Sequence, residues 1–381
     1  MENKYYYATY RLVADDLKKA TDALAIGQSV GNPSVRSEFE TPELWRDHAC
    51  ITEILDNKYG IVKVGFPVNN INFEEDGISQ ILVQTMGGQM DIDIIKGCRL
   101  IDLEFPEEFK FMGPKFGLSG MKSFCGVPKD QPLFGGITKP KVGLSPEKHF
   151  DLVKILIDGG CNFIKEDEIL SGASHCDMYK RIDLVMNYIY KTNAKVFYCV
   201  SIHSDWPYLM ERAKMVASMG GNGIHINFHC GLGSYRSIRR LNLPILMHFQ
   251  KSGDRILTNP DHAYSISDIL LYKLMSLSGC DTLHCGMIGG YMTADDLRTK
   301  DIVDMLMKQN SVPALSCGMH PGLVDNISNI LGHANWMANV GGALTGHPDG
   351  TLAGTKAMVQ AVTKKHGKEY QRAIEKWGKP G

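Results

Sequence analysis

The sequence predicts an α/β protein in which a C-terminal TIM (β/α)8 barrel follows a smaller N-terminal α+β domain. From Leu133 onward, eight short apolar runs alternate with helical stretches over about 240 residues, which is the size and period of such a barrel. The preceding part instead mixes strand-like runs such as Tyr5–Leu12 with helix-like stretches such as Asp15–Leu24. We therefore expect residues 1–125 to form the N-terminal domain and residues 126–381 the barrel.

The eight predicted barrel strands share short length and apolar content. They are Phe134–Thr138, Asn162–Lys165, Val196–Ile202, Gly223–Phe228, Pro244–Phe249, Thr282–Cys285, Ala314–Ser316 and Met337–Val340. A helix is predicted over Ser145–Asp158, with Ser145 as N-cap, Pro146 in the first turn and Gly159 as the stop signal. The segment from Lys122 to Pro132 is predicted to be a linker. Periodicity alone leaves a doubly wound sheet as an alternative to the barrel.

Composition and charge argue against several classes of function. The chain is 44% hydrophobic and 22% charged with a formal net charge of −1, so electrostatics favours neither nucleic acid nor an anionic membrane as a partner. Its apolar runs are too short to span a bilayer, and its first residues do not form a signal peptide. The ten cysteines contain no Cys-x-x-Cys pair, which indicates reduced thiols and predicts a cytoplasmic protein.

Charged residues gather where the first two predicted barrel strands end, the place where barrels carry their catalytic groups. Lys139 and Lys141 flank a proline after the first strand, and Lys165-Glu166-Asp167-Glu168 ends the second. Alternation along a strand directs Lys165 and Asp167 to one face, and two carboxylates suit Mg²⁺. Lys165 could add oxygen ligands as a carbamate formed with CO2. A solvated loop and a strand end with internal salt bridges are the alternatives.

Further polar groups and glycines mark later strand ends. His248 and His284 are predicted at the ends of the fifth and sixth strands, where they would face a common pocket, although a single histidine is more often structural. Gly318 follows the seventh strand, and Gly341 and Gly342 follow the eighth. Glycines at these positions predict a phosphate site built from backbone N–H groups, with simple turn chemistry as the alternative.

These motifs together resemble the large subunit of the ribulose-bisphosphate carboxylase/oxygenase (RuBisCO) superfamily. The strongest stretch is residues 136–145, Gly-Ile-Thr-Lys-Pro-Lys-Val-Gly-Leu-Ser, followed by Gly-Gly-Cys-Asn-Phe-Ile-Lys-Glu-Asp-Glu at residues 159–168. The resemblance continues through residues 278–286, 316–321 and 341–348. It covers the barrel well and the N-terminal domain weakly.

The resemblance implies roles for the matching residues. Lys165 would be a carbamylated lysine that binds one Mg²⁺ per subunit together with Asp167 and Glu168. Lys139 would handle the proton of a substrate enolate. The remaining site residues would contact the substrate: Lys141, His248, His284 and Ser316 the sugar or its surroundings, and Gly318, Gly341 and Gly342 a phosphate. The resemblance also implies a homodimer or an assembly of dimers.

Departures from the family pattern point to its RuBisCO-like (form IV) members. Tyr291 stands where carboxylases carry a loop lysine, and Phe249 aligns with the arginine that binds the second phosphate. Gly27 and Gly88 align with the N-terminal glutamate and asparagine. These departures predict loss of CO2 fixation and a preference for monophosphates over bisphosphates.

The predicted activity is Mg²⁺-dependent enolisation of a phosphorylated ketose or keto acid, of the isomerase or tautomerase type. Either Lys139 or Lys165 would be the base. Decarboxylation of a β-keto sugar-acid phosphate through the same enolate, genuine ribulose-bisphosphate carboxylation and a non-catalytic metal-binding relative remain alternatives. One member type, the diketo-methylthiopentyl-phosphate enolase, uses an N-terminal lysine that residues 84–91 lack.

Overall fold

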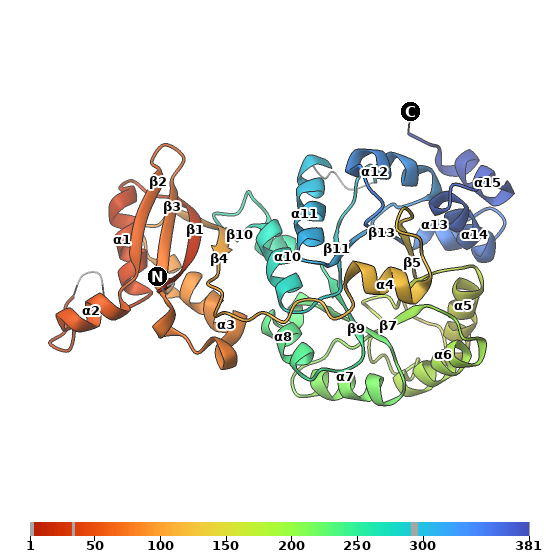
Figure 1. Ribbon diagram of the computed structural model, residues 1–381, viewed down its shortest axis with the longest axis horizontal. Helices are drawn as coiled ribbons and strands as arrows, with labels where there is room; N and C mark the ends of the chain where they lie inside the picture. The colour runs from red at the N-terminus through yellow and green to blue at the C-terminus, as the bar shows by residue number, and fades with distance from the viewer. Residues whose placement is uncertain (1–3, 33–34, 291–295, 381) are drawn as a thin grey trace. The chain divides into compact units, whose positions relative to one another are not determined.

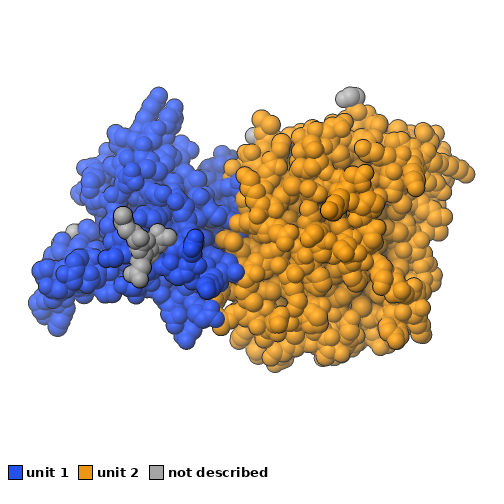
Figure 2. Space-filling view, viewed as in Figure 1, with its two compact units in different colours: residues 1–111, 253–274 blue, residues 112–252, 275–381 orange. Residues whose placement is uncertain are grey.

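The computed structural model describes residues 4–32, 35–290 and 296–380 (Figure 1). The chain forms two compact units, coloured separately in Figure 2. Unit 1 comprises residues 1–111 and 253–274, and unit 2 comprises residues 112–252 and 275–381. The units therefore do not divide at residue 125.

Unit 2 contains a closed eight-stranded barrel in which all neighbouring strands are parallel. In chain order the strands are β5 (Leu133–Ile137), β6 (Phe163–Lys165), β7 (Phe197–Ser201), β8 (Gly223–Asn227), β9 (Leu246–Gln250), β11 (Thr282–Gly286), β12 (Val312–Leu315) and β13 (Met337–Val340). Each overlaps a predicted strand. The pairing of β9 with β11 and of β13 with β5 closes the sheet, which confirms the barrel and excludes the doubly wound alternative.

Helices surround the barrel strands on the outside (Figure 1). They are α4 (Gly117–Cys125), α5 (Pro146–Asp158), α6 (Met178–Thr192), α7 (Tyr208–Ser218), α8 (Gly233–Arg240), α10 (Asp268–Leu277, which begins in unit 1), α11 (Asp296–Lys308), α12 (Val324–Leu331), α13 (Gly342–Thr345), α14 (Thr351–Val362) and α15 (Lys368–Trp377). Short 3-10 turns lie at Phe228–Cys230 (η3) and Pro321–Leu323 (η4). No described helix is long and apolar enough to cross a membrane.

The predicted helix after β5 shows how local sequence sets an element. The Ser145 hydroxyl accepts a hydrogen bond from the Lys148 N–H, Pro146 occupies the first turn, and Gly159 caps the end of α5. Val153 and Leu156 lie on its buried face. Capping and amphipathic spacing therefore agree, as the sequence predicts.

The end of the barrel where the strands begin is filled with apolar side chains. Leu133, Phe163, Phe197 and Leu246 belong to one buried cluster, and Met121 of α4 completes it. The predicted linker is thus partly wrong, because its first residues lie in α4. Since each fully buried side chain of this kind contributes about 1.5–3 kcal/mol, this end is a packed core, and polar chemistry is left to the opposite end.

Unit 1 is built on a five-stranded sheet with the order β10-β4-β1-β3-β2. Its elements are β1 (Tyr5–Val13), α1 (Leu17–Gly27), α2 (Pro42–His48), β2 (Ile51–Asp56), β3 (Ile61–Pro67), η1 (Val68–Asn70), α3 (Phe73–Thr85), η2 (Gly88–Asp91), β4 (Gly97–Glu104), α9 (Arg255–Thr258) and β10 (Tyr264–Ile266). Strand β1 alternates buried and partly exposed residues, as a half-buried strand does. Strand β10 comes from the segment between β9 and β11 and pairs in parallel with β4. That pairing is why residues 253–274 belong to unit 1.

Candidate active site

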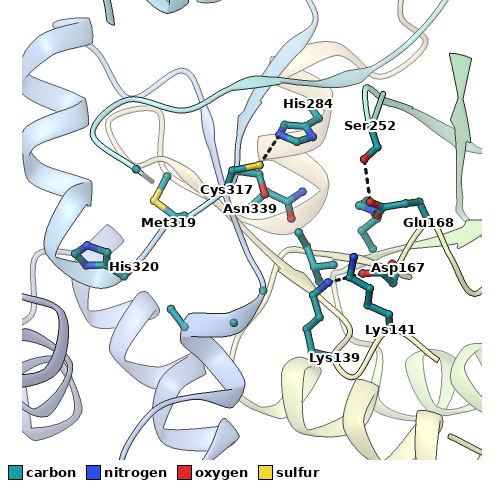
Figure 3. A pocket seen from close by; sticks show the side chains of 18 of the residues that line it. Lys139, Lys141, Asp167, Glu168, Ser252, His284, Cys317, Met319, His320 and Asn339 are labelled. Carbon is teal, nitrogen blue, oxygen red and sulfur yellow. Dashed lines mark hydrogen bonds and ion pairs between the residues drawn. The ribbon is translucent and has the colours of Figure 1, made fainter. Parts of the chain in front are cut away.

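A cavity of about 770 Å³ opens where the barrel strands end (Figure 3). Ten of the eleven residues predicted for the site line it: Lys139, Lys141, Lys165, Asp167, Glu168, His284, Ser316, Gly318, Gly341 and Gly342. His248 is absent from the described lining. The structure therefore brings together side chains from β5, β6, β11, β12 and β13 that are far apart in the sequence.

The charged residues at the end of β6 alternate between the inside and the outside of the barrel. Lys165 and Asp167 are buried in the cavity wall, with 2% and 1% of their surface exposed. Glu166 between them points the other way, where its carboxylate accepts hydrogen bonds from the Arg181 guanidinium at 2.7 and 3.0 Å. Ion pairs therefore form on both sides of this strand end, between Glu166 and Arg181 outside the barrel and between Lys165 and Glu168 in the cavity wall.

The Lys165 amine lies against the carboxylate of Glu168, with 3.0 Å between Nζ and Oε2. Burial lowers the pKa of Lys165, and the negative charges of Glu168 and Asp167 oppose that shift only in part. Burial, the largest single influence, would raise the pKa of Glu168, but the Lys165 charge and the hydrogen bonds from its own backbone, Lys165 and Ser252 together hold that pKa below its usual range. The Ser252 hydroxyl donates to the other Glu168 oxygen at 2.9 Å. A lysine with a lowered pKa is more readily the free amine that can react with CO2.

Lys139 contacts both Asp167 and Gly341. Its amine forms an ion pair with Asp167. Its aliphatic chain lies beside Gly341, where an added Cβ would come within 3.2 Å of the lysine Cε. Lys141 is exposed at the rim of the same loop. Lys139 can therefore reach a molecule held between the carboxylates and the glycines.

The donor set fits a magnesium ion once Lys165 is modified. The described residues contain no group of three His, Cys, Asp or Glu side chains placed to hold a metal. Asp167 and Glu168 offer two carboxylates, the hard oxygen ligands that Mg²⁺ prefers, and Lys165 is the neighbour that a carbamate would turn into a third.

His284 and His248 take different places, although both lie within strands and not after them. His284 lines the cavity, and its Nε2 lies 3.7 Å from the Cys317 sulfur. His248 is fully buried one layer deeper, where its ring packs against Phe163 and His225. His248 is therefore not among the described lining residues, because the strand continues two residues further and brings Gln250 to the cavity, and its contact with a substrate stays a prediction.

Sequence reasoning missed several lining residues, among them Gln250, Ser252, Cys317 and Asn339. Gln250 and Ser252 could have been found by continuing the alternation of β9 from His248. Asn339 directly precedes the predicted Val340-Gly341 strand end. Cys317 lies between the predicted site residues Ser316 and Gly318, so its position in the sequence could have indicated that it lines the cavity.

The residue aligned with the phosphate-binding arginine lies outside the cavity. Phe249 is fully buried and packs against Tyr235. Two residues later, the positive charge of Lys251 contributes to lowering the pKa of His284, although Lys251 is not among the described residues that line the cavity. The preference for monophosphates stays a prediction. Tyr291 lies outside the described residues.

The glycines after β12 and β13 line the same cavity as the lysines and acids. Gly318 has a φ of 95°, a conformation that favours glycine. An added Cβ at Gly342 would meet nothing within 4 Å, so its backbone is open to an approaching group. These are the properties that a backbone phosphate site requires.

Comparison with known proteins agrees with this architecture. Residues 126–377 match the model of the ribulose bisphosphate carboxylase large chain catalytic domain, and residues 9–109 match that of its N-terminal domain. The ribulose bisphosphate carboxylase of Archaeoglobus fulgidus is 31% identical over 360 residues, covering 84% of this chain and 80% of the relative.

Solved structures show the same fold. An octameric ribulose-1,5-bisphosphate carboxylase/oxygenase from Pyrococcus horikoshii, crystallised with sulfate, superimposes with a TM-score of 0.88 at 24% identity, covering 99% of this chain and 94% of the other. The rubisco-like protein MtnW from Alicyclobacillus acidocaldarius superimposes with a TM-score of 0.83 at 25% identity, covering 99% and 100%. Since both domain models match in order across most of the sequence, the chain belongs to the ribulose bisphosphate carboxylase large-chain superfamily, which includes the rubisco-like proteins.

Proposed function

We propose that this protein catalyses Mg²⁺-dependent enolisation of a phosphorylated ketose or keto acid and does not fix CO2. The observation that carries the proposal is the buried Lys165, whose amine lies 3.0 Å from Glu168 in the wall that also holds Asp167. Burying a charged lysine beside two carboxylates costs desolvation free energy, which indicates a functional role for the group. Carbamylation of Lys165 to form a metal ligand is such a role.

The residues of the cavity divide the work between two ends. Asp167, Glu168 and the carbamate of Lys165 would hold Mg²⁺, which supplies Lewis-acid stabilisation of the charge that develops on the substrate oxygen. The amine of Lys139 or the carbamate on Lys165 removes the proton from the carbon beside the carbonyl, and both side chains line the cavity. The ion pair with Asp167 orients the Lys139 amine toward the cavity.

The other end holds the phosphate. The backbone N–H groups of Gly318, Gly341 and Gly342 would approach its oxygens, because glycine leaves room for close contact. Gly341 lies against the Lys139 side chain, so a phosphate bound there sits within reach of the base. This spacing favours a substrate whose acidic carbon is close to its phosphate.

A second candidate is ribulose bisphosphate carboxylation, the activity named for the Archaeoglobus fulgidus relative. The matches to both domain models of the ribulose bisphosphate carboxylase large chain favour it. The tyrosine at position 291, in place of the family's loop lysine, argues against it. A homodimer or an assembly of dimers is proposed by analogy with the octameric Pyrococcus horikoshii enzyme.

Deuterium exchange tests the proposal directly. The purified protein, preincubated with bicarbonate and Mg²⁺, is mixed in D2O with a panel of ketose phosphates and β-keto sugar-acid phosphates. Exchange of a carbon-bound hydrogen, followed by NMR, is expected for at least one ketose and should require both Mg²⁺ and bicarbonate. Release of CO2 from a keto acid without exchange of any ketose identifies the decarboxylase instead. No exchange and no CO2 release across the panel argue for a non-catalytic relative.

A further inference from the structure

A second set of polar residues lines the same cavity as the lysines and acids. Cys317 and His284 lie beside each other in the cavity wall, and Asn339 lines the same cavity, as do Lys139, Asp167 and Glu168 (Figure 3). The Cys317 sulfur is 3.7 Å from Nε2 of His284. Proton removal by a lysine uses none of Cys317, His284 and Asn339, so these three are available for another step.

The backbone at Cys317 is held in a conformation that L side chains rarely adopt. Its φ is 84°, and Gly318 after it has a φ of 95°. The backbone at Gly290 passes close to this turn, since a Cβ added at Gly290 would lie 2.3 Å from the Cys317 carbonyl oxygen. Glycine would fit position 317 without strain. A strained residue that lines an active-site cavity points to a use for its side chain, here the thiol.

The imidazole beside the thiol is neutral. Burial lowers the pKa of His284 to about 3, and the charges of Lys251 and Lys165 add to the shift. A neutral imidazole keeps one nitrogen as an acceptor, so the thiol can donate its hydrogen to Nε2 when no substrate is bound. A backbone hydrogen bond with Ser316 helps to hold the ring.

Asn339 supplies independent evidence for a ligand in this cavity. Its side chain lines the cavity and is 1% exposed, yet neither its amide nitrogen nor its amide oxygen has a hydrogen-bond partner within the described chain. A buried amide without partners is costly. The arrangement is explained if a polar group of the substrate meets this amide in the cavity that Cys317 also lines.

We propose that Cys317 is the acid that protonates the enolate carbon, with His284 and Asn339 as its positioning residues. This rests on the proposed enolate chemistry. The S–H bond breaks and a C–H bond forms, while the electron pair of the enolate double bond enters the new C–H bond and the carbonyl re-forms. The thiolate then takes a proton from solvent. The step is the same whether the enolate arises by proton removal or by loss of CO2, and cysteine is a suitable general acid.

The test separates formation of the enolate from its protonation to product. Wild type, Cys317→Ala, Cys317→Ser and Cys317→Gly are compared in D2O with D-ribulose 1-phosphate, D-ribulose 5-phosphate and D-fructose 1-phosphate. We expect the Cys317→Ala and Cys317→Gly variants to keep exchange into recovered substrate and to form product at least about 100-fold more slowly, the usual contribution of general acid catalysis. Cys317→Ser should fall between them and wild type.

Stability distinguishes this role from a structural one. Cys317→Gly relieves the strained φ, so its melting temperature should equal or exceed that of wild type while product formation is lost. Cys125→Ala is the matched control, since Cys125 packs at the opposite end of the barrel. Product formed at the wild-type rate by Cys317→Gly would overturn the proposal, whereas absence of exchange in the wild type would overturn the proposed function itself.

A labelling experiment needs no turnover. Iodoacetamide alkylation of Cys317, followed by mass spectrometry, should slow when the same ketose phosphates and Mg²⁺ are present, while alkylation of Cys125 should not change. Equal alkylation of Cys317 with and without them would show that the thiol does not face the bound sugar, and would refute the proposal.

Discussion

The carboxylate of Glu166 and the guanidinium of Arg181 form a fully buried, doubly hydrogen-bonded ion pair, at 2.7 and 3.0 Å, on the outer side of β6. The Ser201 N–H donates to the same carboxylate at 2.9 Å. This pair holds Glu166 outside the barrel, so that its neighbours Lys165 and Asp167 face inward. The wall proposed to bind the metal therefore depends on an interaction that lies outside the cavity.

Replacing Arg181 with Met should lower the free energy of unfolding by about 3–5 kcal/mol, because it leaves the buried Glu166 charge without its partner. Urea denaturation at pH 7 measures this. Arg372→Met is the control, because its pair with Glu375 is exposed and should contribute about 1 kcal/mol or less. Equal losses in the two variants would contradict the assignment.

The same pair makes stability depend on pH. Burial alone would raise the pKa of Glu166, but the Arg181 charge and hydrogen bonds outweigh it and hold that pKa below the ordinary value. The pair thus stabilises the fold above the unfolded pKa of about 4.3, and this contribution is lost as the pH falls through the lower folded pKa. In Arg181→Met the pKa should rise, so the variant should lose less stability than wild type on acidification. Melting temperatures of both proteins, measured from pH 7 down to pH 2, decide the point.

Lys165→Ala should abolish Mg²⁺-dependent exchange, since it removes both a proposed ligand and a candidate base. The exposed Lys148→Ala on α5 is the control and should behave as wild type. Exchange is followed by NMR with and without added bicarbonate. Full activity of Lys165→Ala without added CO2 would show that no carbamate is needed.

Mg²⁺ and bicarbonate together should raise the melting temperature of the wild type more than either alone. A ligand that binds only the native state stabilises it by about 2.7 kcal/mol at a hundredfold excess over its Kd. Asp167→Asn should remove the joint effect. An equal shift with Mg²⁺ alone would mean that the metal binds without a carbamate on Lys165.

Gly342→Ala should leave stability unchanged and weaken binding of ketose phosphates. A Cβ there meets no protein atom within 4 Å, but it would occupy the space through which the backbone approaches a phosphate. Gly88→Ala in unit 1 is the matched control, because its Cβ is equally unobstructed. Calorimetric titration of both variants is the measurement, and equal affinity would place the phosphate elsewhere.

Incubation with ribulose bisphosphate and radiolabelled CO2 should give no acid-stable product. Carboxylation creates a new negative charge that needs a cation, and preorganised charge of this kind contributes about 3 kcal/mol or more to a transition state. Tyr291 supplies no such charge. Stoichiometric incorporation would establish the protein as a carboxylase and would assign the cationic role to another residue.

The sequence by itself located the eight strands of the barrel and most of the residues that line its cavity. Strand and helix alternation is a local property, so all eight barrel strands could be located before any contact was known. The facing of Lys165 and Asp167 follows from the two-residue period of a strand, which needs no information from elsewhere in the chain. The glycines after β12 and β13 were predictable for a similar reason, because their place directly after the strand ends is enough to predict that they line the cavity.

The tertiary structure decided what depends on contacts between distant segments. Strand β10 joins the sheet of unit 1 by pairing with β4, and nothing in the three residues Tyr264–Ile266 specifies that partner. How far β9 extends into the cavity, and so whether His248 or Gln250 lines it, depends on the register of eight strands closing together. The contact between Cys317 and His284 joins two strands of that closed barrel. Local sequence sets which way a side chain points along its own strand, whereas depth and partners are set only when the barrel closes.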